Sequence, residues 1–412
     1  MNLGNLKTKK IVIIVLVVAA GIALAYLGPS FRNADLIPNI IPVKKNPYVK
    51  EYLMPSDSAP NGLVVDTTGL VWVSSKNATL YSVDPTNGQV RHYEIRNPGT
   101  LHERTGVDTM VWAMQDVDGK VWLSALGTSS IWSFDPSSNT FKSYLSETGA
   151  PFQMKVGDDG KIWFTTLRGD TVGVIEKLSN GTYTISDFNV GHGTNPAGIF
   201  LQNDSLWIAG VGSQNILNYK INLDNNSVKD ISKIRSIPSD NSTMFSTPTD
   251  LMVDKNILWL TEHGTSFLTS YDMSTGKITR YPTSQNGFHT TTLPFWIRAS
   301  HDPKVLWFNE HQGNKIGRFD FSNGTMTEYS IPSLPKDGYL TYPLNLSQDP
   351  NDEKILWFSE WNTDKIGVIN GHDAIPFETS LDVTHITLEH GKTGAVDFTI
   401  TGKPRVTLYL NA

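Results

Sequence analysis

The chain has 412 residues, with 34 Lys and Arg against 40 Asp and Glu, which leaves a net charge of −6. This balance provides no basic surface for phosphates, so we expect no nucleic-acid partner. The hydrophobic fraction of 39% excludes wholesale disorder, and the absence of cysteine excludes disulfides, thiolate metal sites and cysteine nucleophiles.

The chain begins with a candidate membrane segment. Lys7, Lys9 and Lys10 precede an uncharged apolar run over residues 11–28. A helix of that length rises about 27 Å, just enough to cross the hydrocarbon core of a bilayer. The lysines predict that the N-terminus stays in the cytoplasm. Residues 1–28 are therefore expected to be a signal anchor, a single transmembrane helix that displays the rest of the chain outside the cytoplasm.

A cleavable signal peptide is the competing interpretation of the same segment. Ala23-Leu24-Ala25 matches an A-x-A cleavage site, and cleavage there would give a secreted protein. Both interpretations export the remaining chain. The proline-rich residues 29–47 are expected to form an extended spacer between the membrane and the body of the protein.

Residues 48–370 contain seven repeats, each marked by a tryptophan in a short apolar run. The tryptophans lie 41 to 52 residues apart, at Trp72, Trp122, Trp163, Trp207, Trp259, Trp307 and Trp357. A period of 40 to 50 residues with short β-like runs is typical of propeller blades, and each repeat offers four such runs. The expected fold is all-β, a seven-bladed β-propeller with four-stranded blades.

The two ends of this repeat region complete each other. The seventh repeat lacks an outer strand, whereas residues 48–53 match the outer strands of the other repeats but precede the first repeat. We expect this N-terminal strand to close the last blade. Residues 371–412 then form a short β-rich tail, with strands expected over 382–389 and 395–400. The tail resembles an incomplete immunoglobulin-like sandwich, which either packs on the propeller or belongs to a longer domain.

Short strings in the late repeats resemble the blade signature of the virginiamycin B (streptogramin B) lyases. They are W-F-N-E at 307–310, N-K-I-G-R at 314–318, E-Y at 328–329, W-F-S-E at 357–360 and K-I-G at 365–367. The resemblance covers residues 48–370 and implies a propeller whose metal-assisted elimination, commonly with Mg²⁺, opens a cyclic depsipeptide. It further implies roles for histidines after the prolines of late first strands and for the glutamate that ends the last tryptophan strand. Glu360 fills the glutamate position, whereas Phe295 and Leu344 fill the histidine positions.

Repeat topology predicts where a site would lie. The loops between blades and the loops between second and third strands share one face, around the mouth of the channel. Glu262, Glu310 and Glu360 end three successive tryptophan strands, so we expect an acidic arc of candidate catalytic carboxylates over blades five to seven. Carboxylates held together raise one another's pKa or recruit a cation. Mg²⁺ or another divalent cation is therefore expected, with Glu310 and Glu360 as candidate ligands.

Histidines and arginines on the same face are candidate ligand-binding residues. The set comprises His263, His311, His192, His289, Arg298 and Arg168, with His102 in a further inter-blade loop. Imidazoles near the arc could act as ligands or general bases, and the arginines could neutralise the arc or bind an anion. The alternative is structural: the glutamates would bond neighbouring turns, the histidines would be solvated, and Arg298 would form a ring salt bridge.

Three functions remain open. The first is a lyase or hydrolase that uses the acidic arc with a divalent cation. The second is a non-catalytic module that binds a small molecule, peptide or glycan, and the third is a structural element of the cell envelope. The unfilled histidine positions favour binding over catalysis. We expect a membrane-anchored, externally displayed propeller that binds a ligand at the channel mouth, with enzymatic activity left open.

Overall fold

The computed structural model describes residues 48–75, 79–94, 111–126, 129–146, 148–239, 244–285, 289–333, 341–371, 377–381 and 398–402. Within these ranges, no helix is long and apolar enough to cross a membrane. The expected anchor at 1–28 and the spacer at 29–47 lie outside the described residues.

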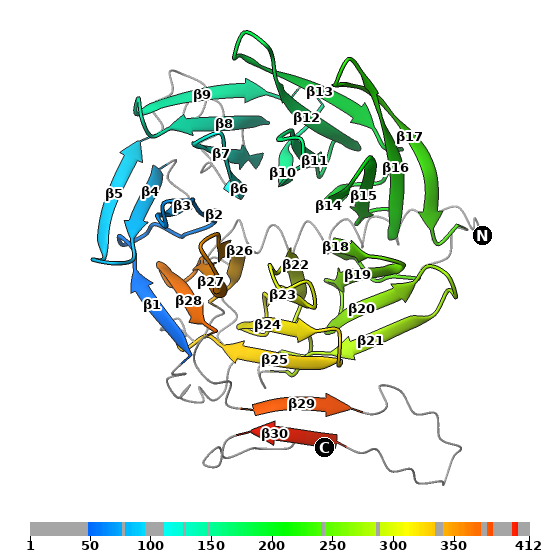
Figure 1. Ribbon diagram of the computed structural model, residues 1–412. Helices are drawn as coiled ribbons and strands as arrows, with labels where there is room; N and C mark the ends of the chain where they lie inside the picture. Colours follow the sequence, from blue (N-terminus) through cyan, green and yellow to red (C-terminus); the bar gives the residue numbers. More distant parts are fainter. Residues whose placement is uncertain are drawn as a thin grey trace, which may run out of the picture. The chain divides into compact units, whose positions relative to one another are not determined.

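Seven antiparallel sheets follow one another around a common centre, which confirms the all-β propeller (Figure 1). Every blade is a meander whose first strand lies nearest the centre. Blade one comprises β2 (Leu63–Val65), β3 (Val71–Ser74), β4 (Thr79–Asp84) and β5 (Gln89–Glu94). Blade two comprises β6 (Val111–Val117), β7 (Lys120–Ala125), β8 (Ser130–Asp135) and β9 (Thr140–Leu145). Blade three comprises β10 (Pro151–Val156), β11 (Ile162–Thr166), β12 (Thr171–Lys177) and β13 (Tyr183–Asn189). Blade four comprises β14 (Pro196–Gln202), β15 (Ser205–Gly210), β16 (Asn215–Asp224) and β17 (Ser227–Ile237). Blade five comprises β18 (Pro248–Asp254), β19 (Ile257–Glu262), β20 (Phe267–Asp272) and β21 (Ile278–Pro282). Blade six comprises β22 (Pro294–Ala299), β23 (Val305–Glu310), β24 (Lys315–Asp320) and β25 (Thr325–Ser330).

The seventh blade is closed by the first strand of the propeller, as expected. It comprises β26 (Pro343–Asp349), β27 (Asp352–Glu360), β28 (Lys365–Asn370) and β1 (Val49–Leu53). Val49 lies opposite Ile369 in an antiparallel ladder, and its side chain is buried between blades six and seven. The Asp364 carboxylate accepts hydrogen bonds from the backbone N–H groups of Asp57 and Ala59 at 2.8 Å each. The segment that follows β1 is thus also fastened to blade seven.

Blade six carries two additional strands on its outer edge. β29 (Phe377–Leu381) pairs with β30 (Phe398–Gly402) and meets β25 at Met326 and Thr379, so this sheet has six strands. The strand expected over 395–400 overlaps β30, whereas the one expected over 382–389 lies outside the described residues. The part of the tail that is described therefore extends the propeller's sheet.

The repeated tryptophans are wedges between blades, as their spacing predicts. All seven are at most 5% exposed. Trp259 of blade five, for example, lies 5.3 Å from the ring of Phe319 in blade six, and Trp122 of blade two lies 4.8 Å from Tyr183 in blade three. Each wedge buries a large apolar area, which is the main favourable contribution to blade packing.

In five repeats, the residue two positions after the tryptophan joins neighbouring blades by hydrogen bonds. Thr261 accepts the N–H of Asp250 in its own first strand at 3.2 Å and donates to the carbonyl of Phe295 in the next blade at 2.5 Å. A register shift interrupts the ladder between first and second strands at this point, so the side chain supplies a partner to backbone groups there. Equivalent cross-blade bonds come from Ser124, Thr165, Asn309 and Ser359. This role was not predicted, although Ser, Thr or Asn follows W-x in six of the seven repeats.

Replacing Thr261 by Val tests this bridge. The change keeps the side-chain shape but withdraws the hydroxyl from two buried backbone groups. We expect the free energy of unfolding to fall by about 1–3 kcal/mol, measured by urea denaturation. Thr184→Val on the outer strand of blade three is the control, with an expected change below about 0.5 kcal/mol. Equal effects of the two substitutions would show that the bridge contributes nothing to stability.

Candidate functional site

The three glutamates end the second strands of blades five to seven, as expected, and none is more than 1% exposed. Glu310 lies on the same sheet face as Phe308, two residues earlier, and Phe308 packs against blade five. By the same reasoning, Glu262 faces blade four and Glu360 faces blade six. The three carboxylates therefore lie in three different inter-blade interfaces. The expected acidic arc is not a single site, and the described part of the chain contains no cluster of three acidic or histidine side chains that could hold a metal ion.

Glu262 is held in an ion pair within blade five. Arg280 Nε donates to its carboxylate at 2.8 Å. Thr269 Oγ1 donates at 2.5 Å, and the backbone N–H of Ser246 donates at 2.8 Å. Both carboxylate oxygens are used by these bonds, which supports a structural role for this residue.

Glu310 lies beside a network of charged side chains in blade six, and neither of its buried carboxylate oxygens has a hydrogen-bond partner among the described residues. Lys315 lies directly opposite Glu310 in the ladder, and its Nζ is 3.3 Å from the carboxylate of Glu328. The same ammonium donates to Ser284, which follows the outer strand of blade five. Burial and the charge of Glu328 raise the pKa of Glu310 well above its usual value. The network thus favours the neutral acid at this position over a charged metal ligand.

Blade seven repeats the network around Glu360. Lys365 Nζ lies 3.2 Å from Glu51 on the closing strand β1, and Ser333 donates to Glu51 through its backbone N–H at 3.0 Å. Thr363 Oγ1 donates to Glu360 at 2.7 Å. Burial and the charge of Glu51 raise the pKa of Glu360 to about 8. The carboxylate that raises the pKa of Glu360 is therefore Glu51, on β1 of the same blade. From the sequence, the glutamate of a neighbouring blade was expected to have this effect.

Two of the candidate histidines do lie together. His263 and His311 have ring centroids 5.1 Å apart, and His311 is only 2% exposed. His263 Nδ1 lies 3.2 Å from the carbonyl oxygen of Pro294. Burial lowers the pKa of His263 to about 4, and burial together with His263 lowers that of His311 well below its usual value. Both rings are therefore neutral at neutral pH.

The remaining histidine and arginine candidates have separate positions. Arg168 is exposed in the loop between β11 and β12, and His192 is fully exposed before β14, with its Nδ1 3.4 Å from Asp170. His289 is half-buried before β22, and burial lowers its pKa. His102 lies outside the described residues. His263 and His311 thus form a pair among the described histidines.

Sequence reasoning missed an aromatic row at the mouth of the channel. It runs from His263 to Phe295, at 4.9 Å between ring centroids, and from Phe295 to His311 at 4.1 Å. It continues to Tyr342 at 4.7 Å and to Trp361 at 6.0 Å. We call these five residues the mouth row. The positions of these residues in the sequence could have revealed the row. Phe295 and Tyr342 flank the prolines that open first strands. His263, His311 and Trp361 directly follow the glutamates that end second strands.

Aromatic rings from opposite sides of the ring of blades meet next to the mouth row. Phe152 on β10 of blade three lies 5.1 Å from Trp296 and 6.2 Å from Phe295, both on β22 of blade six. Blades three and six are not neighbours, so these contacts span the centre of the propeller. Phe152, Phe295 and Trp296, which we call the channel plug, are at most 6% exposed. At the position where the resemblance implies a histidine, Phe295 thus supplies a ring that packs in this plug.

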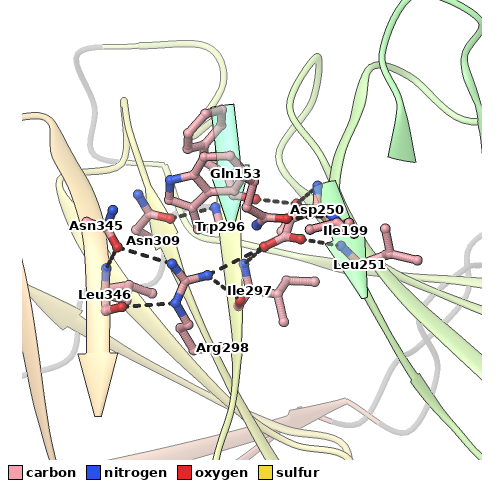
Figure 2. Close-up of polar contacts among 12 residues, drawn as sticks. Gln153, Ile199, Asp250, Leu251, Trp296, Ile297, Arg298, Asn309, Asn345 and Leu346 are labelled. Carbon is pink, nitrogen blue, oxygen red and sulfur yellow. Dashed lines mark hydrogen bonds and ion pairs between the residues drawn. The ribbon is translucent and has the colours of Figure 1, made fainter. Parts of the chain in front are cut away.

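Arg298 lies beyond the plug along β22 and joins three blades (Figure 2). Its Nε donates to the carbonyl of Leu346 at 2.9 Å, and Nη2 donates to Asn345 Oδ1 at 3.1 Å, both in blade seven. Its Nη1 lies 3.8 Å from the buried carboxylate of Asp250 in blade five. The expectation that Arg298 neutralises the glutamate arc is therefore wrong, because its carboxylate partner is Asp250. The ring salt bridge that was the alternative is the observed arrangement.

Comparison with known proteins identifies the fold. No family model and no curated protein matches the chain. Among solved structures, virginiamycin B lyase from Staphylococcus aureus is similar with a TM-score of 0.60 and 24% identity, covering 78% of this chain and 98% of that chain. A streptogramin B lyase has a TM-score of 0.60 and 22% identity over 78% and 97% of the two chains, and a mitotic checkpoint complex chain has 0.57 and 13% over 83% and 96%. The resemblance to virginiamycin B lyases is confirmed for the fold, which by itself does not establish an activity.

Proposed function

We propose that this protein binds a ring-containing small molecule or peptide at the mouth of the channel without cleaving it. The mouth row carries this proposal. His263, Tyr342 and Trp361 remain partly exposed, while Phe295 and His311 are buried among them. Partly exposed aromatic rings that pack on buried rings provide a preformed apolar surface, on which planar or cyclic groups stack. The neutral state of both histidines favours a ligand without net charge in its stacked part.

Binding is favoured over elimination by the residues that replace the lyase signature. Phe295 and Leu344 are buried apolar side chains where the resemblance implies histidines, so they supply no general base. Glu360 is 0% exposed and bonded to Thr363 in its own turn. The export segment expected at residues 1–28 would place the mouth outside the cytoplasm, where such a binding module would meet external ligands.

Quinupristin is a suitable first probe, because it is present in a solved structure of a catalytically inactive virginiamycin B lyase that shares this fold, with a TM-score of 0.60. We expect saturable binding of quinupristin to the full chain by isothermal titration calorimetry. Trp361→Ala removes one stacking surface and should weaken binding about tenfold, equivalent to about 1.4 kcal/mol. His192→Ala, an exposed residue outside the mouth row, is the control and should leave the affinity unchanged.

Two outcomes would contradict the proposal. Absence of saturable quinupristin binding, or equal quinupristin affinity of the wild type and Trp361→Ala, would show that the mouth row is not the binding surface. Mass spectrometry of quinupristin after incubation with Mg²⁺, compared with incubation in EDTA, tests cleavage separately. A ring-opened product that forms only with the cation would show that the protein is a divalent-cation-dependent lyase and not a binding module.

A further inference from the structure

In each blade, one residue of the first strand lies opposite the tryptophan of the second strand. These seven residues lie at the same level along the channel. These residues are Val64, Gln115, Lys155, Phe200, Met252, Arg298 and Ser347. Only Lys155 and Arg298 among them are charged. They belong to blades three and six, the two blades whose rings meet in the channel plug. The repeat therefore places two cations at the same level, beyond the plug as seen from the mouth.

The charges at this level do not balance. Lys155 interacts electrostatically with Arg298 and with Asp250, whose carboxylate is 0% exposed. The oxygens of Asp250 already accept the backbone N–H groups of Leu251 at 2.9 Å and Ile297 at 2.8 Å. The local sum is two positive charges and one negative charge, one positive charge in excess. An uncompensated charge that is only partly exposed to water is costly, so an anion here would stabilise the folded protein.

Hydrogen-bond donors for such an anion are available. Within the described residues, the Lys155 ammonium forms no hydrogen bond or ion pair, so its three N–H groups are free for a ligand. Arg298 donates to Leu346, Ile297 and Asn345, which uses three of the five N–H groups of a guanidinium. Both side chains are partly exposed, with 14% exposure for Arg298, so water and small ions reach them. Burial also lowers the pKa of Lys155 to about 8, in accord with a cation that lacks a close counter-ion.

We propose that Lys155 and Arg298 bind a small oxyanion at the centre of the propeller, beyond the channel plug. The anion would accept charge-assisted hydrogen bonds from both side chains and link blades three and six across the ring. Sulfate, phosphate and a carboxylate group share the chemistry that this site recognises. The site uses neither the mouth row nor the glutamates, so it does not depend on the proposed function.

Sulfate titration of the full chain by isothermal titration calorimetry, at constant ionic strength, tests this site. We expect saturable binding of one sulfate per chain. Lys155→Met removes the charge but keeps a long apolar side chain, and its affinity for sulfate should be at least about tenfold lower. Sulfate should also raise the melting temperature of the wild type more than that of Lys155→Met. Lys229→Met, on the exposed outer strand of blade four, is the matched control and should bind sulfate as the wild type does.

Parallel titrations with acetate distinguish the two sources of the anion. Binding of acetate with an affinity similar to that of sulfate would identify a carboxylate site, whereas binding of sulfate alone would identify a site for a free tetrahedral oxyanion. Both results support the proposal. Absence of saturable binding of both anions, or equal sulfate affinity of the wild type and Lys155→Met, would overturn it.

Discussion

Deletion of residues 48–54 is expected to lower the melting temperature by roughly 5–10 °C, the value for a loss of about 3–6 kcal/mol in a chain of this size. This segment contains β1, which forms the whole outer strand of blade seven. Val49 and Met54 are 7% and 3% exposed, and burial of each such side chain contributes about 1.5–3 kcal/mol. The deletion also removes Glu51, the ion-pair partner of Lys365. Differential scanning calorimetry of the full chain measures the effect.

Removal of seven residues from the proline-rich segment 29–47 is the matched control, because it shortens the chain equally and leaves every described strand of the propeller in place. We expect its melting curve to coincide with that of the wild type. An unchanged curve for the 48–54 deletion would mean that the ring does not depend on β1 for its stability.

Replacement of Glu360 by Gln is expected to stabilise the protein increasingly as the pH rises. The pKa of Glu360 is about 8 in the folded state against 4.5 for an ordinary glutamate, so unfolding releases a proton between these pH values. The wild type therefore loses stability as the pH rises from 4.5 to 8, whereas the Gln variant has no such proton to release. The difference should be on the order of 4 kcal/mol near pH 8, since one pKa unit corresponds to about 1.36 kcal/mol. Urea denaturation at pH 5, 6.5 and 8 measures it.

Glu262→Gln is the control, for which we expect the opposite change in the free energy of unfolding. Glu262 holds the same position in blade five, but its carboxylate is paired with Arg280 at 2.8 Å. Its replacement should destabilise the protein by about 1–3 kcal/mol, a moderate loss because Arg280 is 38% exposed and therefore partly screened by water. If both variants lose similar stability at every pH, Glu360 is an ionised partner of Lys365, and its neutral state is refuted.

Much of the fold could be predicted from residues that act within one repeat. Each tryptophan must be buried wherever a blade packs on the next, so its recurrence predicts the number of blades. The outer strand missing from the seventh repeat and the extra strand at 48–53 predicted the closure, because an unpaired sheet edge is costly. Both expectations are confirmed by the burial of the tryptophans and by the pairing of β1 with β28.

The candidate site was predicted less well, because strand-end positions do not specify the blade interface that a side chain enters. Glu262, Glu310 and Glu360 share one repeat position, and the sequence analysis placed them around one mouth. Their side chains instead enter successive inter-blade interfaces, where Arg280 pairs with the first and lysine–glutamate networks surround the other two. These partners come from the third and fourth strands of the same blade, and no spacing rule predicted which of them carry charge of either sign.

The sequence by itself determined the seven blades and their closure, because these follow from a repeat read locally. Only the tertiary structure decided which residues meet across the centre. Phe152 and Trp296 are far apart in sequence and belong to blades that are not neighbours, yet their rings lie 5.1 Å apart. The reason is geometric: closure of the ring brings all first strands around one axis, and the size of each inward side chain then decides which blades touch there.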